Sequence, residues 1–174
     1  VNDAVEVTPM VNLGKTQSIG YEFELGYKYG RNFNALLSLS QFKTLYKIKH
    51  DSNGAVLSYY DQQIPNEPYF NANANLQYVF RDFIQDKGLL SINYNMAFVN
   101  SFATNWITGG VGATKYNPDQ FSHDLGLSYA FPNKQFIVSF DARNIFNEQL
   151  FDNYAVQKPG RAFYLKLNYT INKF

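Results

Sequence analysis

The sequence predicts an all-β protein that forms an antiparallel, up-and-down segment of a transmembrane β-barrel, and three observations lead to this prediction. Apolar and polar residues alternate with a period of two over seven stretches, which is the side-chain period of a strand. Charged residues make up only 17% of the 174 residues and aromatic residues 18%, so few charges are present to cover a water-soluble surface. The connections between the stretches are alternately short and long, as in outer-membrane barrels.

Four strands are predicted in the first part of the chain. Apolar side chains at alternate positions mark residues 19–29, 33–40, 70–80 and 90–98. The residues Gly30-Arg31-Asn32 predict a tight turn between the first two. Within residues 44–63, the run Asp51-Ser52-Asn53-Gly54 predicts a hairpin that extends past the main sheet.

Three further strands are predicted at residues 121–131, 136–142 and 163–171. The long stretch 101–120 is rich in Gly, Thr and Asn, contains Trp106 and is predicted to be a loop. A polar loop is expected before the last strand as well. In an up-and-down sheet all short turns lie at one end, so we expect the long loops at the other end and the last strand to finish beside the short turns.

The alternation does not decide whether the apolar stripe faces the core of a soluble barrel or the lipid around a membrane barrel. The polar positions carry mostly Asn, Ser, Gln, Gly and Thr, whereas the exterior of a soluble barrel would carry many more Lys and Glu. Aromatic residues gather near both ends of the predicted strands, as in the girdles of membrane barrels, although aromatic residues also favour strands in general. We therefore expect the apolar face to contact lipid and the polar face to line a lumen.

Several function classes lack support in the sequence. A net charge of +1 without a basic run gives no electrostatic footprint for nucleic acid, and the absence of cysteine rules out disulfides and thiolate metal sites. No phosphate loop, metal-ligand spacing or nucleophile motif is present, so the sequence predicts no enzyme, no cofactor and no metal. Glu22 and Glu24 are interpreted as lumen-facing hydrogen-bonding groups rather than a catalytic pair. His123 is interpreted as an interfacial residue.

The C-terminal stretch carries a family resemblance. The run DARNIFNEQLFDNY (141–154), followed by KPGRAFYLKLNYTI (158–171), resembles the C-terminal end of a TonB-dependent outer-membrane receptor. In that family an Asn-hydrophobic-Phe step closes the penultimate strand, and a Pro-Gly-Arg element opens the last one. The matching motif residues here are Asn144, Phe146, Pro159, Gly160, Arg161, Phe163, Tyr169 and Phe174. Phe174 departs from the family pattern because it falls on the polar parity of the last strand.

The resemblance implies that residues 1–174 are the C-terminal part of a barrel of about 22 strands, without the plug domain and the first barrel strands. It implies a place in the Gram-negative outer membrane and active uptake of a scarce ligand, such as an iron–siderophore complex, a cobamide or a glycan. Energy would come from the TonB complex acting on the missing N-terminal region. The expected partners are outer-membrane lipid, the plug domain, the TonB complex and the ligand.

The long loops are where the resemblance implies ligand capture. Tyr59, Tyr60 and Trp106 are the loop aromatics best able to stack on a bulky ligand, although each serves equally well to stabilise the loops. Two other functions stay open at this point. One is a small autonomous outer-membrane barrel with a structural or adhesion role, and the other is a soluble ligand-binding β-barrel.

Overall fold

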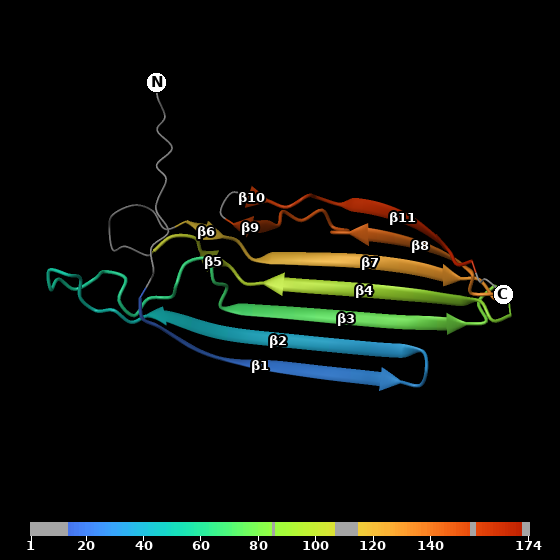
Figure 1. The fold of residues 1–174 in the computed structure, drawn as a ribbon, viewed down its shortest axis with the longest axis horizontal. Coiled ribbons are helices and arrows are strands. Elements are labelled where there is room, and N and C mark those ends of the chain that lie inside the picture. Colours follow the sequence, from blue (N-terminus) through green and yellow to red (C-terminus); the bar gives the residue numbers. More distant parts are fainter. Residues whose placement is uncertain (1–13, 85, 107–114, 154–155, 172–174) are drawn as a thin grey trace, which may run out of the picture.

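Seven long strands form one antiparallel sheet in the computed structural model, which describes residues 14–84, 86–106, 115–153 and 156–171 (Figure 1). The strands pair in chain order, so the sheet is an up-and-down meander with its first and last strands at the two edges. They are β1 (Thr16–Tyr29), β2 (Phe33–Tyr46), β3 (Phe70–Arg81), β4 (Leu89–Val99), β7 (Gln120–Ala130), β8 (Phe136–Arg143) and β11 (Ala162–Tyr169). The seven strands predicted from the alternation are confirmed.

The connections alternate between short and long, as the sequence predicted. The described residues within 30–32, 82–88 and 131–135 make the short turns, and those within 47–69, 100–119 and 144–161 lie at the opposite end of the sheet (Figure 1). Two long connections contain small ladders that the sequence did not predict: β5 (Phe102–Ala103) with β6 (Tyr116–Asn117), and β9 (Phe151–Asn153) with β10 (Val156–Gln157). No helix in the described part of the chain is long and apolar enough to cross a membrane.

Strand β2 continues past its predicted end at residue 40 as far as Tyr46. It stays paired there with the start of β1, where Thr16 lies opposite Tyr46 without a change of register. The side chains therefore keep alternating, and Phe42, Thr44 and Tyr46 extend the polar-parity side of the strand towards the long loops. Residues 44–46, which were predicted to belong to the hairpin, are therefore part of the main sheet.

The hairpin between β2 and β3 projects beyond the sheet, as its turn signal predicted (Figure 1). At the tip, Oδ1 of Asp51 accepts hydrogen bonds from the backbone N–H groups of Asn53, at 2.8 Å, and Ala55, at 2.9 Å. At its base, Oε1 of Gln63 accepts a hydrogen bond from the backbone N–H of Thr44, at 3.0 Å. The base of the hairpin is thereby attached to the end of β2.

The register keeps each face of the sheet chemically uniform from one edge to the other. One apolar row of directly opposed residues crosses all seven strands: Tyr27, Ala35, Leu76, Tyr94, Leu125, Ala142 and Phe163. The next row lies on the other face and is mainly polar: Lys28, Asn34, Gln77, Asn93, Gly126, Asp141 and Tyr164. A slip of one residue in any pair would exchange the two faces, so the register is what separates them.

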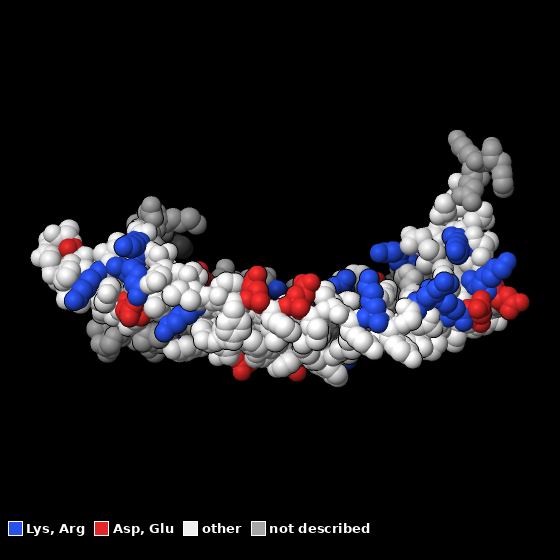
Figure 2. All heavy atoms as spheres, turned by 90° about the horizontal axis from the view of Figure 1, so that it is seen from below, with Lys and Arg blue, Asp and Glu red and all other residues white. Residues whose placement is uncertain are grey.

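The sheet is a single layer without an interior core of its own. Among the described residues no large side chain is completely buried, and large apolar side chains stay exposed, such as Leu25 at 53% and Phe163 at 61%. Seen edge-on, the molecule is a long, shallow curved slab (Figure 2). Soluble domains cover an apolar sheet face with a second layer. The apolar face of this sheet has no such cover within the described chain.

Two glycines on the polar parity of β1 differ sharply in their surroundings, which gives a first testable prediction. A Cβ on Gly20 would collide with the backbone carbonyl oxygen of Gln41 and with the ring of Phe42, whereas a Cβ on Gly26 would meet no atom within 4 Å. We expect Gly20→Ala to destabilise the sheet by about 1–3 kcal/mol, because overpacking forces a backbone shift. The midpoint of guanidinium unfolding in lipid vesicles measures this effect. Gly26→Ala is the matched control, and an equal loss in both variants would contradict the packing explanation.

Candidate functional site

Neutral amides and hydroxyls cover the polar face of the central strands. Nδ2 of Asn34 donates to Oε1 of Gln77 at 3.1 Å, and Asn75 donates to the side chain of Asn95 across the next strand pair. A shallow hollow of about 180 Å³ lies over this region. Its polar lining residues are Ser38, Asn73, Asn75, Asn95, Ser122 and Asp124. The face can therefore hydrogen-bond a polar neighbour largely without charged groups.

Three aromatic rings meet at the long-loop end of the polar face, and we call Tyr46, Tyr59 and Trp106 the aromatic cluster. The rings of Tyr59 and Trp106 stack with centroids 4.8 Å apart, and Tyr46 contacts them edge-on at 5.0 Å and 5.6 Å. Tyr46 is only 7% exposed and lies on the polar parity of β2. The cluster therefore stands above the polar face rather than above the apolar one.

The aromatic cluster joins two loops that are distant in sequence. The backbone N–H of Asn66 donates to the carbonyl oxygen of Ala103 at 2.8 Å, which ties the loop after β2 to the small strand β5. Each of the two loops also contains a buried side-chain amide nitrogen without a hydrogen-bond partner. These atoms are Nε2 of Gln63 in the first loop and Nδ2 of Asn117, in β6, in the second. A buried donor without a partner is destabilising, so these two atoms weaken the packing of the loop bases.

The structure places the loop residues that the sequence singled out as follows. Tyr59 and Trp106 come together, whereas Tyr60 lies outside the ring cluster and is 36% exposed. Tyr46 was missed because the sequence reading ended the strand at residue 40. The alternation gave no signal for this extension, because Phe42 and Tyr46 occupy the polar parity while Gln41 and Lys43 occupy the apolar one.

Asn144 is the centre of a hydrogen-bonded turn that closes β8. It is 5% exposed and has a left-handed backbone with a φ of 47°. Its side chain holds the backbone of Glu148 with two bonds, Nδ2 donating to the carbonyl oxygen at 2.8 Å and Oδ1 accepting from the N–H at 2.9 Å. Its own N–H donates to Oδ1 of Asp124 at 2.8 Å, and Oδ2 of that carboxylate binds Arg143 at 3.1 Å.

The same turn receives the start of the last strand. Oδ1 of Asn147 accepts a hydrogen bond from the backbone N–H of Arg161 at 2.9 Å, and a Cβ on Gly160 would lie 2.7 Å from that oxygen, so a larger residue there would displace the Asn147 side chain. Nη1 of Arg161 donates to the carbonyl oxygen of Ile145 at 3.3 Å, and its guanidinium lies 5.9 Å from the ring centre of Phe163. The Asn-hydrophobic-Phe and Pro-Gly-Arg segments are thus in contact.

The remaining motif residues are more scattered. The ring of Phe146 is 63% exposed and meets His123 edge-on at 4.9 Å. Tyr169 lies opposite Phe136 at the short-turn end and is 67% exposed. Phe174 lies outside the described residues.

A comparison with models of protein families identifies the family of this chain. The model of the TonB dependent receptor-like beta-barrel matches residues 1–145. The chain belongs to this family. A search of curated proteins found no match. The matched region ends inside the turn after β8, so most of the C-terminal stretch that resembles a TonB-dependent receptor lies beyond it, and the two observations reach the same family from different parts of the chain.

The receptor barrel family consists of outer-membrane transporters, and outer-membrane barrels carry an apolar band on their outward side. The apolar face of this sheet corresponds to that side, and we call its apolar side chains the lipid-facing band. Its outward side chains on β1 run from Ile19 to Tyr29, which corresponds to about 33 Å along the strand and about 25 Å of height at the usual barrel tilt. That height matches the apolar band of outer-membrane barrels.

A row of aromatic rings follows the short-turn end of this band in the receptor barrel. Successive ring centroids lie between 4.6 and 6.5 Å apart. The row consists of Tyr27, Phe33, Tyr78, Phe80, Phe83, Tyr129, Phe131 and Phe136. Outer-membrane barrels have aromatic girdles of this kind at their membrane–water interfaces, and we call these residues the short-turn aromatic row.

His123, Glu22 and Glu24, which were considered as candidate functional residues, have the following neighbours in the structure. His123 stacks on Phe121 at 5.9 Å, and its Nδ1 is 2.6 Å from the hydroxyl of Tyr94. Glu22 and Glu24 lie opposite serines of β2. Within the described ranges no three His, Cys, Asp or Glu side chains are grouped so as to hold a metal ion.

Proposed function

We propose that this chain is a wall segment of a larger outer-membrane transport barrel, which surrounds a plug domain and takes up a scarce ligand such as an iron–siderophore complex with energy from the TonB complex. In this function the lipid-facing band seats the wall in the Gram-negative outer membrane. The polar face contributes to the lumen, and the long loops contribute to ligand capture. The observation that carries the proposal is the two-faced, single-layer sheet of a receptor barrel family member.

The direction of the edge strands supports a larger barrel. Seven strands that are each antiparallel to the next leave β1 and β11 running in the same direction. Pairing these two edges with each other would create a parallel pair, so a wholly antiparallel barrel needs an odd number of additional strands between them. Bacterial single-chain barrels have even strand numbers. A small autonomous barrel made from these seven strands is therefore disfavoured.

The second alternative, a soluble ligand-binding barrel, conflicts with the exposed aromatic residues of the lipid-facing band. The experiment that tests it is fractionation of cells that produce the whole receptor carrying this chain. We expect the protein in the outer-membrane fraction, extractable only with detergent. Recovery as a detergent-free monomer would overturn the proposed membrane function.

The aromatic cluster is the part of the described loops that we propose for ligand contact. We expect Trp106→Ala to weaken ligand binding at least about tenfold, because loss of a central aromatic anchor commonly costs 2 kcal/mol or more. Equilibrium binding of labelled ferric chelates, a cobamide and an oligosaccharide to the whole receptor measures the effect. Tyr29→Ala removes an aromatic residue at the short-turn end and serves as the matched control.

Energy coupling has a separate readout. Uptake of the bound ligand is expected to stop in cells that lack TonB, while binding to the receptor stays unchanged. If uptake continues without TonB, the proposed energy source is wrong. If Trp106→Ala and Tyr29→Ala bind the ligand equally well, the aromatic cluster serves loop packing instead.

A further inference from the structure

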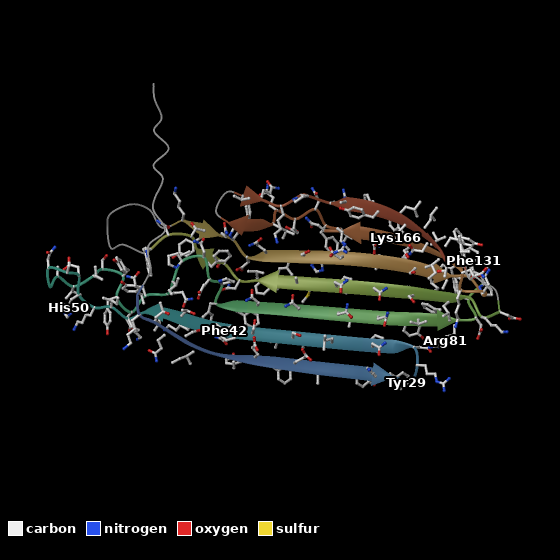
Figure 3. The ribbon with its side chains drawn as sticks, in the orientation of Figure 1. Tyr29, Phe42, His50, Arg81, Phe131 and Lys166 are labelled. Atoms are coloured by element: carbon white, nitrogen blue, oxygen red, sulfur yellow. The ribbon has the colours of Figure 1, made fainter. Side chains whose placement is uncertain are left out.

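A group of exposed cations lies at the short-turn end of the sheet. Basic side chains gather at this end, as they do at the other, while acidic side chains stand out in the middle of the slab (Figure 2). The members are Arg31, Arg81, Lys87 and Lys134, all exposed, and we call them the basic rim. In Figure 3, Arg81 lies at the same end as Tyr29 and Phe131, opposite the end that carries His50.

The cations of the basic rim have little local neutralisation. The ion pairs within the described ranges are Lys47 with Asp61 and Arg143 with Asp124, and neither involves the rim. Asp82, in the turn after β3, accepts a hydrogen bond from the backbone N–H of Lys87 at 2.8 Å. With Asp82 and Asp86 included, this end still has more basic than acidic side chains.

The fold holds the guanidinium of Arg81 against the backbone of the turn that carries Arg31. Nη2 of Arg81, at the end of β3, donates to the carbonyl oxygen of Arg31 in the turn between β1 and β2, at 3.1 Å. This bond ties the end of β3 to the neighbouring turn between β1 and β2. Arginine suits a phosphate, since it binds phosphate oxygens with parallel N–H groups.

The basic rim directly borders the short-turn aromatic row. Phe33 follows the Arg31 turn by two residues, Phe83 lies in the Lys87 turn, and Phe131 begins the Lys134 turn, where its carbonyl oxygen accepts from the N–H of Lys134 at 2.7 Å. Aromatic rings in such a girdle lie at the boundary between acyl chains and headgroups. Cations one step farther out are therefore at the level of the lipid phosphates.

We propose that the basic rim binds anionic phospholipid headgroups, with phosphatidylglycerol as the occupant, in the leaflet at the short-turn end. The inference rests on the proposed membrane placement of the sheet. Charge complementarity and continuity with the lipid-facing band select a lipid over a soluble anion, because only a lipid places its acyl chains on the aromatic row and its phosphate on the rim together. The hairpin cations at the long-loop end differ, since Lys47 is paired with Asp61 and the hairpin projects past the sheet.

The test uses the whole receptor carrying this chain, purified and placed in nanodiscs of phosphatidylcholine with increasing phosphatidylglycerol. Lipids retained on the protein are counted by native mass spectrometry. We expect the double variant Arg31→Gln/Lys134→Gln to weaken phosphatidylglycerol retention by about 30-fold, because each cation near an anionic surface contributes roughly a factor of five. The charge-matched control Lys15→Gln/Lys49→Gln removes two exposed cations near the long loops and is expected to keep the wild-type preference.

The outcomes separate this inference from the proposed function. Equal retention of both lipids by the wild type, or an unchanged preference in the rim variant, overturns the lipid site. Loss of a co-purifying acidic protein from the rim variant without a change in lipid retention also overturns it. In each of these cases ligand uptake and outer-membrane fractionation still test the transport function independently. Both side chains are exposed, and heat-modifiable mobility in SDS gels verifies that the variants fold.

Discussion

Asn144→Ala is expected to destabilise the receptor barrel by about 3–4 kcal/mol. The substitution removes both side-chain hydrogen bonds to Glu148, each contributing about 1 kcal/mol, and leaves two backbone groups without partners in a part-buried turn. It also places alanine at a φ of 47°, a left-handed conformation that costs about 1–2 kcal/mol for a residue with a Cβ. The midpoint of guanidinium unfolding in lipid vesicles measures the loss.

Two further variants separate these contributions. Asn144→Gly loses the same hydrogen bonds but accepts the left-handed backbone, so it is expected to be more stable than Asn144→Ala by about 1 kcal/mol. Asn144→Asp keeps the acceptor for the Glu148 N–H and is expected to fall between wild type and Asn144→Gly. Asn133→Ala, at an exposed turn, controls for the loss of an asparagine as such. Equal stability of Asn144→Ala and wild type would show that the turn does not stabilise the end of β8.

Leu37→Arg is expected to destabilise the barrel by about 2–4 kcal/mol, since it places a cation near the middle of the lipid-facing band. Leu37 lies between Leu25 and Ala74 in an apolar row of the sheet. The free energy of unfolding in vesicles and the amount assembled in the outer membrane both measure the effect. Lower assembly accompanies lower stability because the unfolded barrel is degraded.

Two other residues of β2 provide controls, one for the face of the sheet and one for the depth in the membrane. Ser38→Arg puts the same side chain on the polar face, opposite Glu24, and is expected to be tolerated. Gln41→Arg stays on the lipid-facing parity but lies near the end of the band, where an arginine costs about 0–1 kcal/mol. If the free energy of unfolding falls equally for Leu37→Arg and Gln41→Arg, Leu37 does not lie deeper in the membrane than Gln41. If it falls more for Ser38→Arg than for Leu37→Arg, the polar face rather than the apolar face contacts lipid.

The sequence by itself determined the strands, their order and the chemistry of the two faces. These properties depend on local alternation and turn residues, as in Ile19–Tyr29 followed by Gly30, so they can be read without knowing any distant contact. The family could also be recognised from the sequence, because the motif at Asn144 is followed by the motif at Pro159 in the order typical of the family. The small ladders β5–β6 and β9–β10 were missed, since strands of two or three residues contain too few positions to show a period.

Only the tertiary structure decided which distant residues meet. Tyr59 and Trp106 belong to different loops, and the contact of both with Tyr46 depends on how far β2 extends and where the loop bases pair. The joining of Arg81 to the turn of Arg31 likewise depends on the register between β2 and β3. Alternation specifies the face of a side chain but not its neighbour along that face. The neighbour is set by hydrogen-bond register across strands, which is a property of pairs of segments rather than of either segment alone.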